Sequence, residues 1–258
     1  MSLRGRGAVV TGGGRGIGEA VARALAEAGC RVVVTARSTD QIEAVAGSLV
    51  EAGHEAWAVS CDVSDESAVV ELAWQAGEHL GPVDILVNNA GVAPTAPLSR
   101  LTLDMWNQAL GVNATGTFLC TRAFLPAMME RGWGRVVNVA SVAGLFGAKY
   151  MGAYAASKHA VIGFTRSVAP EAAEGGATVN AVCPGFVDTP MTDEGIRMIG
   201  ERSGKSRQEA VDAILADTPQ ARLISPEEVA QAVLSLCEDA AADTNGEAVV
   251  LDGAPGPN

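Results

Sequence analysis

Short apolar runs rich in β-branched residues alternate along the chain with longer stretches in which apolar residues recur at helical spacing. The short runs predict strands at residues 7–11, 31–36, 55–60, 84–89, 134–141, 177–182 and 247–253. The longer stretches predict helices near residues 17–28, 39–52, 65–80, 102–131, 152–174 and 226–239. Several strands are apolar at consecutive positions, which is typical of a parallel sheet with helices on both faces.

This alternation also predicts the fold class. Repeated strand–helix–strand units are typical of a doubly wound α/β domain. No linker-like change in composition and no internal repeat divides residues 1–258. We therefore predict one α/β domain with a seven-stranded parallel sheet and helices on both of its faces.

Residues 190–221 interrupt the alternation with a long, charged, helix-rich connection. Connections of this length in a compact domain are usually functional or disordered. Spaced apolar residues give the segment one apolar side: Ile196, Met198, Ile199, Val211, Ile214 and Leu215. We predict that residues 190–221 form a substrate lid within the domain.

Charge and cysteine content narrow the possible partners. The net charge is −12, which argues against nucleic acid or an anionic membrane surface as a partner. The five cysteines and three histidines are widely scattered, so we expect neither a disulfide framework nor a metal site. The N-terminus lacks the pattern of a signal peptide, and no apolar stretch is long enough to span a membrane. We expect a cytoplasmic protein.

A glycine cluster follows the first predicted strand and opens the first predicted helix. In "VVTGGGRGIGEAVARAL" the spacing is G-x-x-x-G-x-G, at Gly12, Gly16 and Gly18. In this context glycines bring backbone N–H groups and a helix N-terminus against a pyrophosphate, as in Rossmann dinucleotide-binding domains. A tight turn without a ligand is the alternative, and the agreement of strand, glycines and helix favours cofactor binding.

The second predicted strand ends without the acid that would bind the ribose hydroxyls of NAD. The sequence there reads Ala36, Arg37, Ser38, and Arg15 lies within the glycine loop. Two guanidinium groups without an acid suit the 2′-phosphate of NADP; alternatively, both are solvated loop charges. Asp62, after the third strand, caps the next helix, meets the adenine ring, or does both.

Tyr154 and Lys158 lie four residues apart, on one face of a predicted helix. Alone, this pair would more often be a tyrosine that covers core and a lysine that reaches water. Here it belongs to an ordered set: "TGGGRGIG" (11–18), "NNAG" (88–91), "GVNATG" (111–116), "NVASVAG" (138–144), "YAASK" (154–158) and "CPGFVDT" (183–189). With this set the chain closely resembles the short-chain dehydrogenase/reductase family over almost its full length.

The resemblance implies a catalytic set of Asn113, Ser141, Tyr154 and Lys158. Tyr154 would exchange the proton and Ser141 would hydrogen-bond the substrate oxygen. Lys158 would lower the pKa of Tyr154 and hold the nicotinamide ribose, while Asn113 would support a water relay. The implied cofactor-binding residues are Gly12, Arg15, Gly16, Ile17, Gly18, Arg37, Asp62, Val63, Asn89, Ala90, Gly91, Tyr154, Lys158, Pro184, Gly185, Val187 and Thr189. Asn88 either contacts the cofactor or bridges adjacent strands.

Within the family, the sequence looks most like bacterial 3-oxoacyl thioester reductases, especially aromatic polyketide ketoreductases. "VAPTAP" after "NNAG" departs from those polyketide enzymes, which have a glycine-rich stretch there. A mostly apolar substrate pocket is expected from Ser141, Val142, Leu145, Phe146, Met151, Phe186 and Met191.

The expected function is NADPH-dependent reduction of a ketone, either a 3-oxoacyl thioester or a polyketide, to a secondary alcohol. The alternative is a broad-range or NAD-dependent secondary-alcohol or hydroxyacyl dehydrogenase, and a remote one is a non-catalytic NADP-binding regulator. The resemblance also implies a homotetramer built from the helices near 102–131 and 152–174 and the C-terminal strand.

Overall fold

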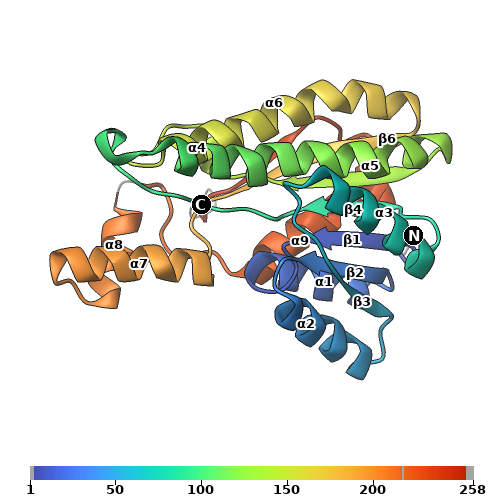
Figure 1. The fold of residues 1–258 in the computed structure, drawn as a ribbon, viewed down its shortest axis with the longest axis horizontal. Coiled ribbons are helices and arrows are strands. Elements are labelled where there is room, and N and C mark those ends of the chain that lie inside the picture. Colours follow the sequence, from blue (N-terminus) through green and yellow to red (C-terminus); the bar gives the residue numbers. More distant parts are fainter. Residues whose placement is uncertain (1–2, 217, 254–258) are drawn as a thin grey trace.

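Seven parallel strands form the centre of the computed structural model, which describes residues 3–216 and 218–253 (Figure 1). The strand order is β3-β2-β1-β4-β5-β6-β7. Their bounds are β1 Gly7–Thr11, β2 Arg31–Ala36, β3 Ala56–Ser60, β4 Ile85–Asn88, β5 Gly134–Val139, β6 Ala177–Pro184 and β7 Ala248–Leu251. The predicted fold class is confirmed. The order reverses between β1 and β4, which is where doubly wound sheets bind ligands beyond the carboxyl ends of their strands.

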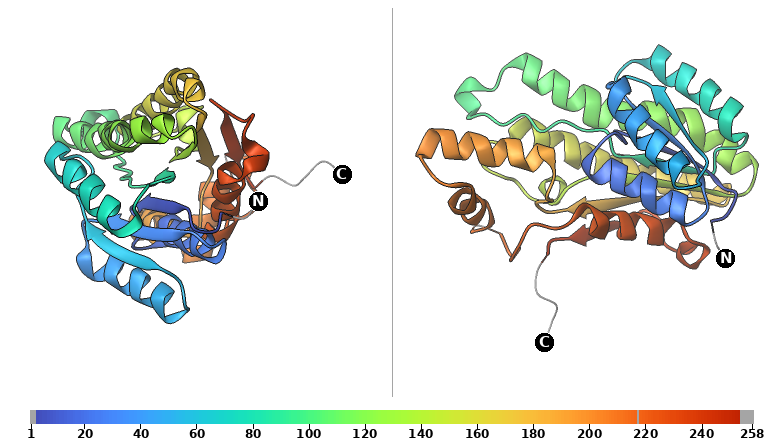
Figure 2. Two further views of the ribbon diagram at one scale, coloured as in Figure 1. Left: turned by 90° about the vertical axis from the view of Figure 1, so that its right-hand side faces the viewer. Right: turned by 90° about the horizontal axis from the view of Figure 1, so that it is seen from below.

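Two helix layers cover the sheet, one on each face (Figure 2). One layer contains α1 Gly16–Glu27, α2 Thr39–Glu51 and α9 Pro226–Cys237; the other contains α3 Glu66–Leu80, α5 Gly116–Glu130 and α6 Gly152–Glu174. Consecutive residues of β1 point to opposite faces of the sheet. Val10 packs in the core beneath the first helix layer, and Val9 packs in the core beneath the second. The inner strands β1, β4, β5 and β6 are therefore buried on both faces, as their sequences predict.

The prediction of one continuous helix at residues 102–131 is wrong. The structure has α4 Leu103–Ala109, a π-helical turn at Leu110–Thr115, and then α5. The wide turn carries Asn113, whose side chain is buried and bonded to the loop after β4. Gly116 packs so closely on Val63 that a Cβ there would lie 2.7 Å from its Cγ2. These tertiary contacts, which hydrophobic periodicity does not reveal, interrupt the helix.

The segment 190–221 folds into two helices, α7 Pro190–Ser203 and α8 Arg207–Leu215, which project beyond the sheet (Figure 1). Ile196, Ala210 and Val211 form a separate buried cluster, against which Ile199, Ile214, Leu215 and Leu223 pack. Most of the predicted apolar side therefore packs between α7 and α8. The segment has a small core of its own.

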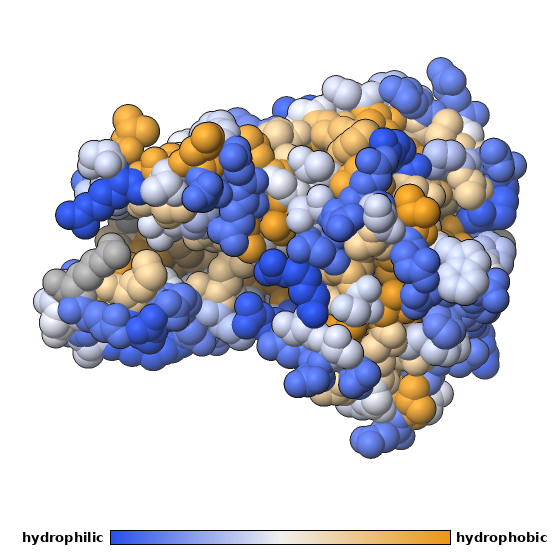
Figure 3. Space-filling view, in the orientation of Figure 1, coloured by the Kyte–Doolittle hydropathy of each residue, from blue (hydrophilic) through white to orange (hydrophobic). Residues whose placement is uncertain are grey.

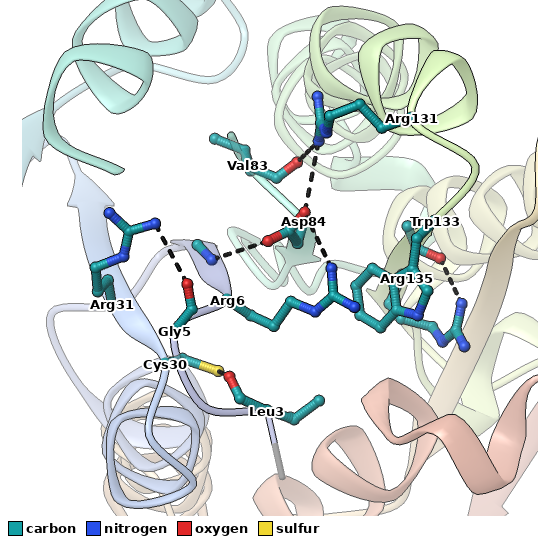
Figure 4. A network of polar contacts seen from close by, with 12 residues as sticks. Leu3, Gly5, Arg6, Cys30, Arg31, Val83, Asp84, Arg131, Trp133 and Arg135 are labelled. Atoms are coloured by element: carbon teal, nitrogen blue, oxygen red, sulfur yellow. Dashed lines mark hydrogen bonds and ion pairs between the residues drawn. The ribbon is translucent and has the colours of Figure 1, made fainter. Parts of the chain in front are cut away.

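A polar network fixes the amino-terminal edge of the sheet, opposite the carboxyl ends of the strands (Figure 4). Asp84, just before β4, lies 3.6 Å from Arg6 Nη1 and 3.7 Å from Arg131 Nη2. The Arg6 and Arg135 guanidinium groups stack on Trp133, at 3.7 and 4.4 Å from its ring centre. These contacts join the starts of β1, β4 and β5.

Candidate active site

The predicted catalytic and cofactor-binding segments meet at the carboxyl ends of the strands. β1 leads into the glycine loop, β4 into residues 89–91, β5 into Ser141, and β6 into residues 184–189. Because β1, β4, β5 and β6 are neighbours in the sheet, residues distant in sequence come together at one edge. The order of the strands thus brings these segments together, and the sequence of each segment determines which side chains lie at the candidate site.

The glycine loop is a tight turn held against the end of β4. Gly12 has φ +63°, and a Cβ at Gly18 would lie 2.2 Å from the Gly12 carbonyl oxygen. The Asn89 amide Nδ2 donates to the carbonyl oxygens of Thr11 (2.9 Å) and Gly12 (3.0 Å). The Thr11 hydroxyl accepts from the backbone N–H groups of Asn89 and Ala90, each at 3.0 Å.

The loop leads directly into the N-terminus of α1. The backbone N–H groups of residues 16–18 have no acceptor within the helix, because they belong to its first turn. The cradle therefore fits an anionic dinucleotide cofactor, since backbone N–H groups and the helix dipole both favour a pyrophosphate there. Thr189 closes the other side, because its Cγ2 lies 3.2 Å from the position of a Cβ on Gly16. Ile17 packs against the core of the α1 layer.

Arg37 and Asp62 lie together beyond the ends of β2 and β3. Their closest N–O distance is 3.9 Å, and their side chains are 62% and 39% exposed. Asp62 accepts from the Ser64 hydroxyl at 2.6 Å, and this bond is the main reason that the pKa of Asp62 is lowered. The suggestion that Asp62 caps the next helix is wrong, because Asp65 accepts the Ser67 and Ala68 amides at the start of α3.

Asn88 bridges strands beneath the site. Its Nδ2 donates to Asn138 Oδ1 (2.9 Å) on β5 and to Thr121 Oγ1 (3.0 Å) on α5. Asn138 in turn donates to Thr165 Oγ1 on α6, at 2.8 Å. This buried chain of polar groups confirms the structural interpretation of Asn88 and locks β4, β5 and two helices together.

Lys158 is 5% exposed, and its Nζ donates to the carbonyl oxygen of Val139 at 2.7 Å. The same Nζ lies 5.8 Å from the centre of the Tyr154 ring. Burial lowers the pKa of Lys158 to about 8, although Cys183 nearby acts in the opposite direction. A buried amine with this pKa can exchange a proton near neutral pH.

Burial raises the pKa of Tyr154, and the adjacent Ser141 hydroxyl offsets part of this effect. The expected lowering of the Tyr154 pKa is therefore wrong, because desolvation of the phenolate is the largest effect on this group and raises its pKa. Ser141 is buried; its Oγ accepts from the Ala143 amide at 3.1 Å and lies 3.5 Å from the Pro184 carbonyl oxygen. The phenol thus stays protonated at neutral pH.

Asn113 joins the loop after β4 to α6. Its Oδ1 accepts from the Val92 amide (2.8 Å), and its Nδ2 donates to the Val92 carbonyl (2.9 Å) and to Ser157 Oγ (2.8 Å). Ser157 Oγ donates to the Tyr154 carbonyl at 2.7 Å. A Cβ on Gly91 would point between Asn113 Oδ1 (3.3 Å) and Lys158 Nζ (3.7 Å). The Asn113 side chain therefore holds the start of α6 in place.

Residues around the predicted substrate pocket differ in exposure. Val142, Met151 and Phe186 are half-buried, whereas Phe146 and Met191 are exposed. Leu145 packs against the core around Val161 and Ile162, so part of its surface is not free for a substrate. Figure 3 shows a hollow between the α7–α8 pair and the lobe that carries α4.

Two important residues are not among the predicted site residues, although Thr11 belongs to the quoted motif "TGGGRGIG". Thr11 ends β1 and organises the Asn89 segment, and its hydroxyl next to a glycine cluster was an available signal. Gln220 is 5% exposed and bonds to Phe186, which no local pattern in the charged segment indicates. The five cysteines are free and buried. Within residues 3–216 and 218–253, no helix is both long enough and apolar enough to cross a membrane.

Comparisons with known proteins agree with this geometry. Residues 6–199 match the model of the short chain dehydrogenase family. A 3-oxoacyl-[acyl-carrier-protein] reductase of Synechocystis sp. is 40% identical over 248 residues, covering 95% of each chain. A cis-4-hydroxycyclohexanecarboxylate dehydrogenase of Sinomonas cyclohexanicum is 40% identical over 251 residues, covering 96% of this chain and 95% of that protein.

Among solved structures, a variant of actinorhodin polyketide ketoreductase with NADPH superposes with a TM-score of 0.91. It is 40% identical, and the match covers 95% of each chain. The solved structure has the same fold as this chain, and the sequence relatives match it over almost the full length. The chain belongs to the short-chain dehydrogenase family and is an oxidoreductase that acts on alcohol or ketone groups.

Proposed function

We propose that this protein is an NADPH-dependent ketoreductase that reduces a 3-oxoacyl thioester or polyketide-type ketone to a secondary alcohol. The observation that carries the proposal is the grouping of Ser141, Tyr154 and buried Lys158 at the sheet edge that also holds the glycine cradle. A bound reduced nicotinamide supplies the hydride for such a reduction.

NADP is favoured over NAD by the residues at the ends of β2 and β1. Ala36 leaves no carboxylate to repel a 2′-phosphate, and Arg37 has only a long, exposed pairing with Asp62. Such a pair is weak, so Arg37 can turn to a phosphate at little cost. Arg15 precedes the first turn of α1 and adds a second guanidinium. The NADPH in the actinorhodin ketoreductase structure supports this assignment.

The proton needed by the reduced carbonyl oxygen comes from Tyr154. Its raised pKa keeps the phenol protonated at neutral pH, and the Ser141 hydroxyl beside it orients the carbonyl oxygen. Lys158, with a pKa of about 8, returns a proton to the phenolate. Asn113 and Ser157 hold the first turns of α6 so that these groups keep their places.

Both substrate alternatives have support. The acyl-carrier-protein reductase and the polyketide ketoreductase favour an acyl substrate that extends under α7 and α8. The equally similar cyclohexanecarboxylate dehydrogenase, and the exposed apolar side chains of Phe146 and Met191, favour a compact hydrophobic ketone or alcohol. We retain a secondary-alcohol dehydrogenase as the second candidate. We also propose that the protein is a cytoplasmic homotetramer.

The test is the oxidation of NADPH by the purified protein with matched panels of 3-oxoacyl thioesters and cyclic ketones, each repeated with NADH. We expect the highest kcat/KM with a 3-oxoacyl thioester and NADPH. A higher value for cyclic ketones would favour the second candidate. If no ketone or alcohol is turned over while NADPH still binds, the protein is a cofactor-binding regulator.

A further inference from the structure

Gln220 is a buried glutamine in the connection that returns from α8 to α9. Its Oε1 accepts from the Phe186 amide at 2.8 Å, and its Nε2 donates to the carbonyl oxygens of Phe186 (2.6 Å) and Arg222 (2.5 Å). The side-chain amide of Gln220 therefore bonds to both backbone polar groups of Phe186 and to the carbonyl of Arg222. Gln220 is 5% exposed, and the loss of its side-chain amide would leave the Phe186 amide without this acceptor, whereas the Phe186 carbonyl would keep the Ile224 amide.

The bonds of Gln220 continue a short pairing between the two ends of the α7–α8 segment. Val187 and Ile224 form a parallel bridge, the Ile224 amide donates to Phe186 (2.9 Å), and the Asp188 amide donates to Ile224 (2.8 Å). The segment thus leaves and re-enters the domain through two stems that lie side by side. Gly185 permits this closure, because a Cβ there would lie 2.4 Å from Gln220 Oε1.

The same stem touches both parts of the active site. The Pro184 carbonyl oxygen lies 3.5 Å from Ser141 Oγ, and the Gly185 amide is fixed to the Leu251 carbonyl at 2.7 Å. At the other end, Thr189 caps α7 and lies against Gly16 of the glycine loop. A shift of the Phe186 peptide would therefore change the positions of groups next to the catalytic serine and the cofactor cradle.

We propose that Gln220 is a positioning residue, which couples the α7–α8 lid to the catalytic loop at residues 184–189 by holding the Phe186 peptide. The role requires a side chain that donates and accepts at once. Methionine at position 220 would fill the same length without these bonds, and a glutamate carboxylate would face two carbonyl oxygens. The kinetic part of this proposal rests on the proposed reductase function, whereas the structural part does not.

The first test compares Gln220→Met with the wild type and with Gln231→Leu, an exposed glutamine on α9. Hydrogen exchange of the cofactor-free proteins should show faster exchange at residues 186–188 and 222–224 only in Gln220→Met. NADPH affinity, measured by fluorescence titration, should fall in the same variant. A roughly 10- to 100-fold loss of kcat is expected, as for other displacements of about 1 Å at reacting groups.

The second test uses Gln220→Glu, which distinguishes positioning from general packing. A buried glutamic acid has a raised pKa, and its protonated form regains one donor and one acceptor. The kcat deficit of Gln220→Glu relative to wild type should therefore shrink as the pH falls from about 8 to about 6. If Gln220→Met did not fold, this pH-dependent recovery of kcat in Gln220→Glu would still test the positioning role.

Wild-type exchange and kcat in Gln220→Met would overturn the proposal. So would a variant that loses only thermal stability, with kcat unchanged per folded molecule, or a pH-independent deficit in Gln220→Glu. If the wild type itself reduces no ketone, the exchange measurement still tests Gln220, because it requires no turnover. The activity assay therefore tests the proposed reductase function, and the exchange measurement tests the role of Gln220 independently.

Discussion

At the scale of single residues, Lys158 is the side chain whose environment most changes its chemistry. Burial lowers its pKa from 10.5 to about 8. Below about pH 8, both folded and unfolded chains carry the proton, and the cost of burying the ammonium is constant. Between about pH 8 and 10.5 the unfolded chain holds more protons at this residue, so its contribution to stability rises with pH.

We therefore expect the unfolding free energy of the wild type, minus that of Lys158→Met, to increase by up to about 3 kcal/mol from pH 8 to pH 10.5. The difference between the proteins is needed because Tyr154 and the buried cysteines have raised pKa values and act in the opposite direction. Denaturant unfolding of the cofactor-free proteins measures it. A difference that does not change with pH would contradict this prediction.

Tyr154→Phe should separate catalysis from binding. The substitution removes only the hydroxyl that is proposed to give the proton, and general acid catalysis is worth on the order of 10²–10⁴-fold. We expect kcat to fall by that factor while NADPH affinity, measured by fluorescence, stays near that of the wild type. Tyr150→Phe is the matched control, since Tyr150 is an exposed tyrosine four residues earlier. Near-wild-type kcat in Tyr154→Phe would exclude the proposed role.

We expect the preference for NADPH over NADH to depend on Arg15, Arg37 and the absence of an acid at Ala36. Charge-assisted bonds to a 2′-phosphate should favour NADPH over NADH by at least about tenfold in kcat/KM. High salt should reduce this ratio, because Arg37 is 62% exposed. The double change Ala36→Asp with Arg37→Ala should reverse it by restoring an acceptor for ribose hydroxyls. Equal kcat/KM values for the two cofactors with the wild type would show that the arginines are solvated charges.

The residues proposed to carry the chemistry could be selected from the sequence, but some of their physical properties could not. The spacing of Tyr154 and Lys158, and the glycines before α1, are local patterns that a sequence displays directly. The pKa of Tyr154 depends on how much solvent the fold removes, and this reverses the expected direction. Gln220 was missed for a related reason, because its partner Phe186 lies 34 residues away.

At the scale of elements, the strand pattern was predictable because the inner strands β1, β4, β5 and β6 are buried on both faces and appear in the sequence as short apolar runs. The break at Leu110–Thr115 was not, because its cause is the bonding of Asn113 to Val92 across the site. The sequence indicates the apolar side of residues 190–221, but it does not indicate which surface that side packs against. Periodicity identifies an apolar face but does not say whether it packs on the sheet or, as here, between α7 and α8.

The α7–α8 pair should respond to ligands as one unit. Its own core is small, with Ile196, Ala210 and Val211 as the buried residues of the cluster. Few buried apolar contacts give a low cost of local opening. We expect amides of residues 190–216 to exchange quickly without ligands and more slowly with NADP and a ketone bound. Equal exchange in both states, measured by mass spectrometry, would make this segment a static insertion.

At the scale of the whole molecule, the proposed tetramer would use the outer face of α5 and α6. Phe118 is 39% exposed and packs edge-on against Phe164, with ring centres 6.1 Å apart. Of the small residues on α6, Ala155 is buried within the protomer, whereas Ala160 and Gly163 are exposed. Only part of the small-residue surface is therefore free for a second copy, and it continues into the exposed aromatic ring of α5.

Gly163 provides a direct test of the proposed tetramer. Beyond its chain neighbours and the backbone of its own helix turn, a Cβ at Gly163 would meet no atom within 4 Å, and the same holds for Gly47 on α2. Glutamate at either helical position should be compatible with the folded protomer, since it has a better helix propensity than glycine. In a tetramer built through α5 and α6, however, Gly163→Glu would place charges in a close helix contact. Light scattering at micromolar concentration should give the mass of a tetramer for the wild type and Gly47→Glu, and a smaller mass for Gly163→Glu. A monomeric wild type would refute the assembly, and a tetrameric Gly163→Glu would move the interface away from this face.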